Sequence, residues 1–144
     1  MNTNLSRPGI ALAAVTLMVG VLVGGTALAV APMETSLTGA QEVPPVKSIA
    51  TGTSTIVVKD DKSVSGSIKT TGIKGTAAHI HQGPTGINGP HIIVLTMSSP
   101  DEWVIPPGSK LTDEQYQSLK DGDLYINVHS AGHKDGEIRA QLKP

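Results

Sequence analysis

The amino-acid sequence predicts an all-β fold, an antiparallel Greek-key β-sandwich of about seven strands with one short helix. The first observation is that short runs of β-branched and apolar residues are separated by turns rich in Gly, Pro, Asn and Asp. The second is that several runs alternate apolar and polar residues, which is typical of strands with one face in water. The third is the near absence of aromatic residues, with one Trp, two Tyr and no Phe. The core must therefore be built from Ile, Val, Leu and Ala, which suits a small sheet protein.

The first 29 residues have the pattern of an export signal. Arg7 is the only charged residue among them, an apolar run extends from 10 to 23, and Ala27-Leu28-Ala29 is a small-residue cleavage site. We expect cleavage after Ala29, which leaves residues 30–144 as one domain outside the cytoplasm, whether secreted, periplasmic or at the cell surface. The alternative is an uncleaved anchor, because the uncharged stretch is about long enough to span a bilayer of ~30 Å. Only that alternative predicts contact with a membrane.

The composition of the predicted domain excludes several classes of protein. Removing 29 residues from 144 leaves 115, the size of one ordinary domain. Removing Arg7 from 11 basic residues leaves 10 against 12 acidic ones, a net charge of −2. No cluster of Lys and Arg of the kind that nucleic-acid binding requires is present, so we expect no nucleic-acid partner. The absence of cysteine excludes disulfides and thiolate ligands.

The first half of the domain is predicted to begin with a short strand over 34–37. Residues 41–46 follow, and the two prolines in this segment cannot donate to a central ladder, so we expect an extended edge or crossover. The runs 52–58 and 63–70 are expected to form a hairpin through the polar turn 59–62.

A strand over 76–81 carries the pair His79 and His81. Successive strand residues point to opposite sides of a sheet, so these two side chains share one face. The loop 82–90 has glycine at every third position and is expected to be a tight, shaped turn. It lacks the Lys, the Ser or Thr and the following helix of a phosphate-binding loop.

The second half of the domain contains the only strong helix signal. Residues 91–95 are apolar on both faces and predict a central, covered strand, while 98–109 is expected to be a loop packed against the sheet through Trp103. A helix over 113–120 is predicted from Thr112 as N-cap with Gln115 as its capping-box partner. A last hairpin is expected from 124–129 and 137–142, and in the first of these runs the apolar face is formed by Leu124, Ile126 and Val128.

The histidines are the residues that predict a chemical function. His91 follows the glycine-rich turn and His129 ends a later strand, so His79, His81 and His129 can supply three nitrogens from two strands, with His91, His133 or water as a fourth ligand. Imidazole suits copper, zinc and nickel, and copper(II) binds a given nitrogen site most tightly among the common divalent ions. We therefore expect a copper site, with zinc as the alternative. Three ligands with an open position would permit catalysis, whereas four would favour storage.

Other polar residues have supporting roles in this interpretation. Tyr125 and Asn127 lie on the same strand face as His129 and are expected either to orient a ligand ring or to be ordinary surface residues. Arg139 is expected to form a buried ion pair with a glutamate that ties the proline segment to the last strand, with a direct part in binding as the alternative. The sequence contains no cysteine and no Gly-x-Ser-x-Gly elbow, so we find no case for nucleophilic catalysis and expect a binding protein rather than an enzyme.

Several motifs in order resemble the chordin-type (CHRD) domain family over about residues 34–142. They are Gln41-Glu42-Val43-Pro44-Pro45, Ala78-His79-Ile80-His81-x-Gly83, Gly89-Pro90, Leu111-Thr112, Gly122-Asp123-Leu124-Tyr125-Ile126-Asn127-Val128-His129 and Gly136-Glu137-Ile138-Arg139. The resemblance implies an extracytoplasmic domain without a general enzymatic reaction. The family pattern covers His79, His81 and His129, whereas His91 and His133 depart from it.

A second, weaker resemblance concerns the order of the histidines. The series His79, His81, Gly89-Pro90-His91 and His129 is similar to that of copper/zinc superoxide dismutase, although the spacing is short, the cysteine pair is missing and no aspartate completes a zinc site. Three functions are therefore expected as alternatives. They are extracytoplasmic handling of a copper-type ion, a dismutase-like metalloenzyme, and a metal-free adhesion or interaction module with an unknown protein partner.

Overall fold

The computed structural model describes residues 30–144, and the predicted export signal, residues 1–29, lies outside the described residues. Within 30–144 the chain forms nine strands, all paired antiparallel. They are β1 (Met33–Thr38), β2 (Thr51–Val58), β3 (Val64–Thr71), β4 (Gly75–Gln82), β5 (His91–Val94), β6 (Thr96–Ser99), β7 (Glu102–Val104), β8 (Leu124–Ser130) and β9 (Ile138–Leu142). The helix α1 (Asp113–Asp121) and the short 3-10 turn η1 (Gly39–Gln41) complete the described elements. The all-β prediction is confirmed, with nine strands in place of about seven.

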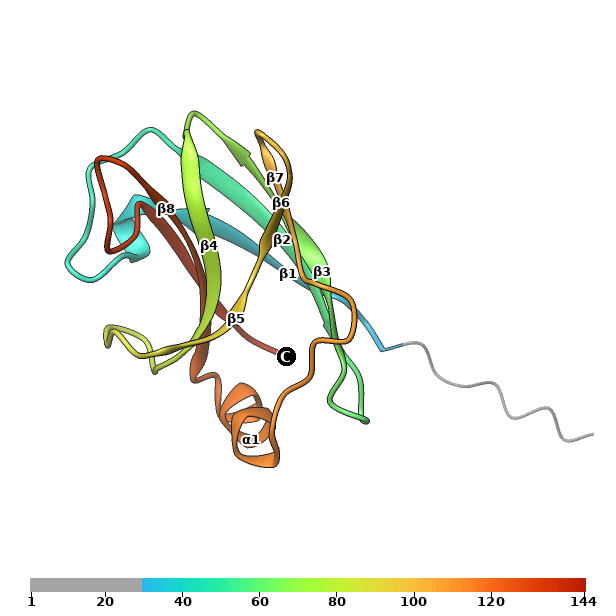
Figure 1. Cartoon of the computed structure of the whole chain (residues 1–144). Helices are drawn as coiled ribbons and strands as arrows, with labels where there is room; N and C mark the ends of the chain where they lie inside the picture. Colours follow the sequence, from blue (N-terminus) through green and yellow to red (C-terminus); the bar gives the residue numbers. More distant parts are fainter. Residues whose placement is uncertain (1–29) are drawn as a thin grey trace, which may run out of the picture.

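The strands form two layers that face each other across an apolar core (Figure 1). Their order is β5-β4-β8-β9-β1-β2-β3-β7-β6, and the two layers join where Thr38 of β1 pairs with Arg139 of β9. The core is aliphatic, as the composition predicts, and its most buried residues include Leu37, Ile56 and Ile68 from one layer and Ile80, Ile126 and Ile138 from the other.

Two local predictions are confirmed. The strands β2 and β3 form the expected hairpin, closed by a hydrogen bond from the Lys59 amide to the Ser63 carbonyl (3.0 Å). Helix α1 begins with the full capping box, in which the Thr112 hydroxyl accepts from the Gln115 amide and the Gln115 side chain accepts from the Thr112 amide. In Figure 1 this helix lies at one end of the sandwich, where it buries Leu119.

Two other predictions are wrong. The run 91–95 is not a central strand, because β5 lies at one end of the sheet order and Val94 is 54% exposed. Two of its apolar residues, Ile93 and Leu95, are buried because their side chains pack into the core from this edge. The segment 98–109 is not wholly a loop either, since β6 and β7 form a hairpin there. The expected packing of Trp103 is nevertheless found, because it pairs with Ile68 and is buried.

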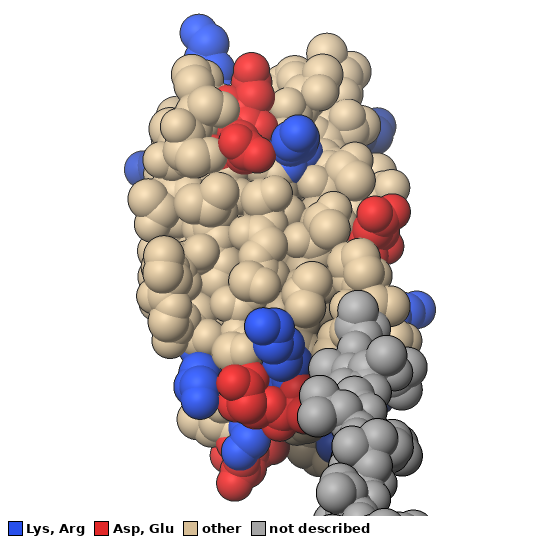
Figure 2. All heavy atoms as spheres, turned by 90° about the vertical axis from the view of Figure 1, so that its right-hand side faces the viewer, with Lys and Arg blue, Asp and Glu red and all other residues tan. Residues whose placement is uncertain are grey.

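The charged residues are distributed without a dominant sign. On the face shown in Figure 2, acidic and basic side chains are mixed near the two ends, and the area between them is uncharged apart from an acidic group on its right side. This face therefore has no basic patch of the kind that nucleic acids require. None of the helices within residues 30–144 has the length and apolar character needed to cross a membrane.

Candidate metal centre

The pairing of β4 with β8 places the histidines on the outer face of one layer. In this register His79 lies opposite Asn127 and His81 lies opposite Tyr125. The residues between them, such as Ile80 and its partner Ile126, point the other way into the core. The strand alternation therefore places His79 and His81 on one face, as the sequence predicts.

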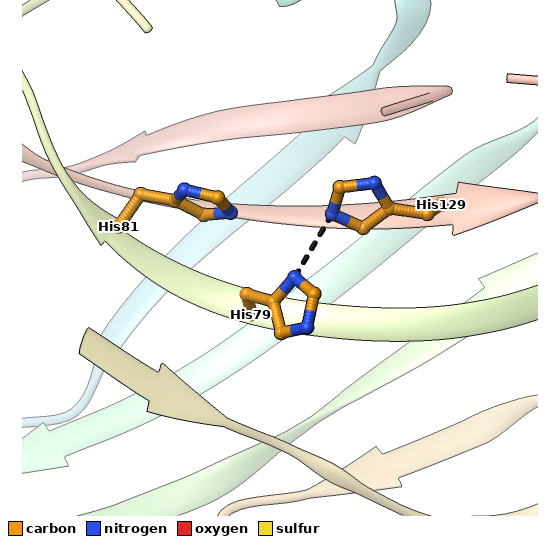
Figure 3. Close-up of side chains that lie close together, drawn as sticks. All are labelled: His79, His81 and His129. Atoms are coloured by element: carbon orange, nitrogen blue, oxygen red, sulfur yellow. Dashed lines mark hydrogen bonds between the residues drawn. The ribbon is translucent and has the colours of Figure 1, made fainter. Parts of the chain in front are cut away.

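Three imidazole rings converge at this face. The side chains of His79, His81 and His129 each offer a ring nitrogen within 4.8 Å of the other two. Figure 3 shows one nitrogen of each ring directed toward a common point, with Nδ1 of His79 3.0 Å from Nε2 of His129. Nitrogens bound to one tetrahedral ion at 2.0–2.1 Å lie roughly 3.4 Å apart, so small side-chain shifts would bring the three donors to one ion.

Two backbone carbonyls determine which nitrogen carries the proton in two of these rings. Nδ1 of His81 lies 2.8 Å from the Gly89 oxygen, and Nδ1 of His129 lies 2.8 Å from the Lys134 oxygen. A carbonyl oxygen can only accept, so each Nδ1 carries a proton, and in the neutral form of either ring Nε2 keeps its lone pair. This is the usual way in which a protein orients a metal-binding histidine through its other nitrogen.

The surroundings of His79 and His81 keep these two rings neutral. Burial, followed by the neighbouring rings of His129, His81 and His91, lowers the pKa of His79 to about 4. Burial also lowers the pKa of His81, against the opposing effect of its hydrogen bond to Gly89. A metal ligand atom must be unprotonated, and a neutral imidazole has one such nitrogen. In His81 this is Nε2, whereas His79 donates from Nδ1 to Nε2 of His129, so metal binding through Nδ1 of His79 requires its proton to move to Nε2 of the same ring.

The two remaining candidate ligands are placed differently. His91 is exposed on β5 with its ring stacked on His79, 5.0 Å between centroids, but it is not one of the three residues whose nitrogens lie within 4.8 Å. His133 lies in the hairpin loop before β9 and is likewise outside the group of three. The structure therefore brings together His79, His81 and His129 and leaves His91 beside them.

A layer of buried polar residues lies behind the cluster, on the same outer face. Tyr125, Asn127 and Arg139 are each no more than 2% exposed, although their strands turn these side chains away from the core. The loop 83–90 contacts Tyr125 and Arg139, and Asn88 in this loop donates to the Val43 carbonyl (2.6 Å). The ring of Tyr125 stacks on His81 with 4.6 Å between centroids, so it orients the ligand ring and is not ordinary surface.

The predicted ion pair of Arg139 with a glutamate is not formed. Its guanidinium instead donates to the carbonyls of Pro84 and Ile87 and to the side chains of Asn88 and Gln141. Glu42 is nearby and acts on Arg139 through its charge, but the only ion pair within 4.0 Å among residues 30–144 joins Lys62 to Asp113. These partners were not predicted because two of them are backbone carbonyls, which leave no mark on residue types, and the other two are uncharged side chains.

Some buried polar atoms in this layer have no hydrogen-bond partner among the described residues. They include Nε2 of His81 and Oδ1 of Asn127. An unpartnered buried polar atom costs about 1–3 kcal/mol, so it is rarely retained without a role. Nε2 of His81 holds a lone pair, is buried, and faces the other two rings, which is what a metal ligand requires.

Comparison with known proteins identifies the family. The sequence pattern of the CHRD domain matches residues 33–142, which include every strand and the helix described above. The chain belongs to the CHRD domain family. No curated protein and no solved structure matches the chain. No match therefore supports the resemblance of this CHRD domain to superoxide dismutase, which rests on the order of its histidines alone.

Proposed function

We propose that this CHRD domain binds a copper ion through His79, His81 and His129 and handles that ion outside the cytoplasm. The observation that supports it most directly is the unpartnered Nε2 of His81, which is buried and aimed at the two other rings. Copper is favoured over zinc because the cluster contains three imidazoles, without carboxylate or thiolate, and copper binds nitrogen ligands most tightly. The extracytoplasmic location rests on the signal-like sequence of residues 1–29.

Isothermal titration of residues 30–144 with copper tests the proposal. The variant His79→Ala/His81→Ala removes two of the three nitrogens, and His133→Ala is the matched control, because it deletes a nearby histidine outside the group. We expect one tight equivalent in the wild type and in the control, and its loss in the double variant. Absence of binding to the wild type, or equal binding to all three proteins, would refute the proposal and favour an interaction module without metal.

Zinc provides the second titration. We expect zinc to compete with copper for the same three residues but to bind more weakly, because nitrogen ligands form more stable complexes with copper(II) than with zinc. Tighter binding of zinc than of copper would reassign the ion and leave the ligands unchanged.

A further inference from the structure

A positive charge is buried behind the candidate metal centre. Arg139 is 2% exposed and its guanidinium lies over Tyr125, with Cζ 3.4 Å from the ring centroid. The opposite face of Tyr125 stacks on His81, with 7° between the two rings. Arg139, Tyr125 and His81 thus form a three-layer stack that ends at a candidate ligand.

The same guanidinium holds the loop that orients His81. It donates to Asn88 Oδ1 (3.1 Å), to the Ile87 carbonyl (3.1 Å) and to the Pro84 carbonyl (3.3 Å). That loop ends with Gly89, whose carbonyl accepts from Nδ1 of His81. Arg139 is therefore linked to His81 both through the ring stack and through the loop.

The charge of Arg139 is poorly compensated. Its four hydrogen-bond acceptors are neutral, and it forms no ion pair within residues 30–144. The nearest acidic influence is Glu42, and burial raises the pKa of that carboxyl to about 7, so it is only partly ionised at neutral pH. The three histidines add no negative charge.

We infer that Arg139 is a specificity-determining residue of the metal centre, which favours the singly charged copper(I) over doubly charged ions. This inference rests on the proposed function. The positive charge of Arg139 lies on the order of 10 Å from the site and repels a bound cation. At an effective dielectric constant of about 20, this repulsion weakens binding on the order of tenfold for each unit of charge on the ion. The repulsion is twice as large for a doubly charged ion. The charge of Arg139 therefore raises the ratio of copper(I) affinity to copper(II) affinity.

Two substitutions of Arg139 separate its charge from its role in positioning. Arg139→Lys keeps the charge but loses the planar fork, and Arg139→Gln loses both. The affinities for copper(I), measured without oxygen, and for copper(II) are determined by competition with chromophoric chelators. We expect Arg139→Lys to bind both ions more weakly and with an unchanged affinity ratio, because only positioning is lost. In Arg139→Gln the lost repulsion opposes the lost positioning, and only this variant should shift the affinity ratio, on the order of tenfold toward copper(II). Such a shift lowers the reduction potential of the bound ion by about 59 mV.

A third variant leaves Arg139 unchanged and serves if Arg139→Gln does not fold, as judged by circular dichroism. Asn88→Asp puts a carboxylate at the atom that already accepts from Arg139, and it loses the hydrogen bond from Nδ2 of the exposed Asn88 to the Val43 carbonyl. It should shift the ratio in the same direction as Arg139→Gln. An unchanged ratio in Asn88→Asp, or an equal shift in the Lys and Gln variants, would overturn the inference. A wild type that binds copper in neither oxidation state would instead refute the proposed function and the inference with it.

Discussion

Gly136 lies against the carboxyl group of Glu42 with no room for a side chain between them. A Cβ at position 136 would stand 2.5 Å from Oε1 of Glu42 and 2.6 Å from Nδ2 of Asn127. The backbone there has φ +130°, a region that residues with a Cβ rarely adopt. We predict that Gly136→Ala lowers the free energy of unfolding by about 1–3 kcal/mol, measured by chemical denaturation.

A neighbouring glycine supplies the control for this substitution. Gly132 lies in the same hairpin loop, and a Cβ built on it meets nothing within 4 Å. Gly132→Ala should therefore change the free energy of unfolding by less than about 0.5 kcal/mol. Similar losses in the two variants would show that the contact with Glu42 is not the cause.

The buried carboxyl of Glu42 makes stability depend on pH. Burial raises its pKa to about 7, above the ordinary 4.5, so the folded protein holds this proton more tightly than the unfolded chain does. The contribution of Glu42 is thus fully present below the unfolded pKa and is lost as pH rises through 7. Glu42→Gln cannot ionise and escapes this loss.

We therefore expect the stability of Glu42→Gln relative to the wild type to increase between about pH 5 and about pH 8, by up to about 3 kcal/mol. Denaturant midpoints of both proteins across this range provide the measurement. A difference that stays constant with pH would mean that the carboxyl ionises as easily in the folded protein as in the unfolded chain.

The loop glycine Gly89 has a similarly tight environment, with a consequence for His81. A Cβ there would stand 1.7 Å from the Gln82 carbonyl oxygen, so the loop must shift in Gly89→Ala. The shift removes the carbonyl that accepts from Nδ1 of His81. We predict that His81 loses its preference for the Nδ1–H tautomer, seen by nitrogen-15 NMR, and that copper affinity falls about 10–100-fold.

Thr85→Ala is the control within this loop, because Thr85 is exposed. Its His81 resonances and copper affinity should match those of the wild type. If Gly89→Ala also leaves the tautomer unchanged, the Gly89 carbonyl does not orient the ring.

Helix α1 offers a test of stability that is independent of the metal centre. The Thr112 hydroxyl accepts from the Gln115 amide at 3.2 Å, and Thr112→Ala should lower the free energy of unfolding by about 1 kcal/mol through loss of this cap. Copper affinity should remain that of the wild type. A variant with weaker copper binding would indicate that general loss of stability, and not ligand geometry, controls the affinity.

The elements that sequence analysis predicted correctly are those whose signals are local. The cap residues of α1 and the alternation around His79 and His81 depend on spacing alone. The edge position of β5 was missed because an apolar run indicates burial but not the place of a strand in a sheet. The hairpin of β6 and β7 was missed because it lies in a proline-rich segment, and the partners of Arg139 because two of the four are loop backbone carbonyls and the other two are neutral side chains.

The pairing of β4 with β8 also has a kinetic consequence. His79 and His129 are separated by 50 residues in the chain, and their approach requires two distant strands to meet. Closing so long a loop lowers the conformational entropy of the chain before the contact is made. An ion held by both residues can therefore bind only when this pairing exists. If the pairing forms after the rate-limiting step, the ion acts by slowing unfolding and leaves the folding rate unchanged.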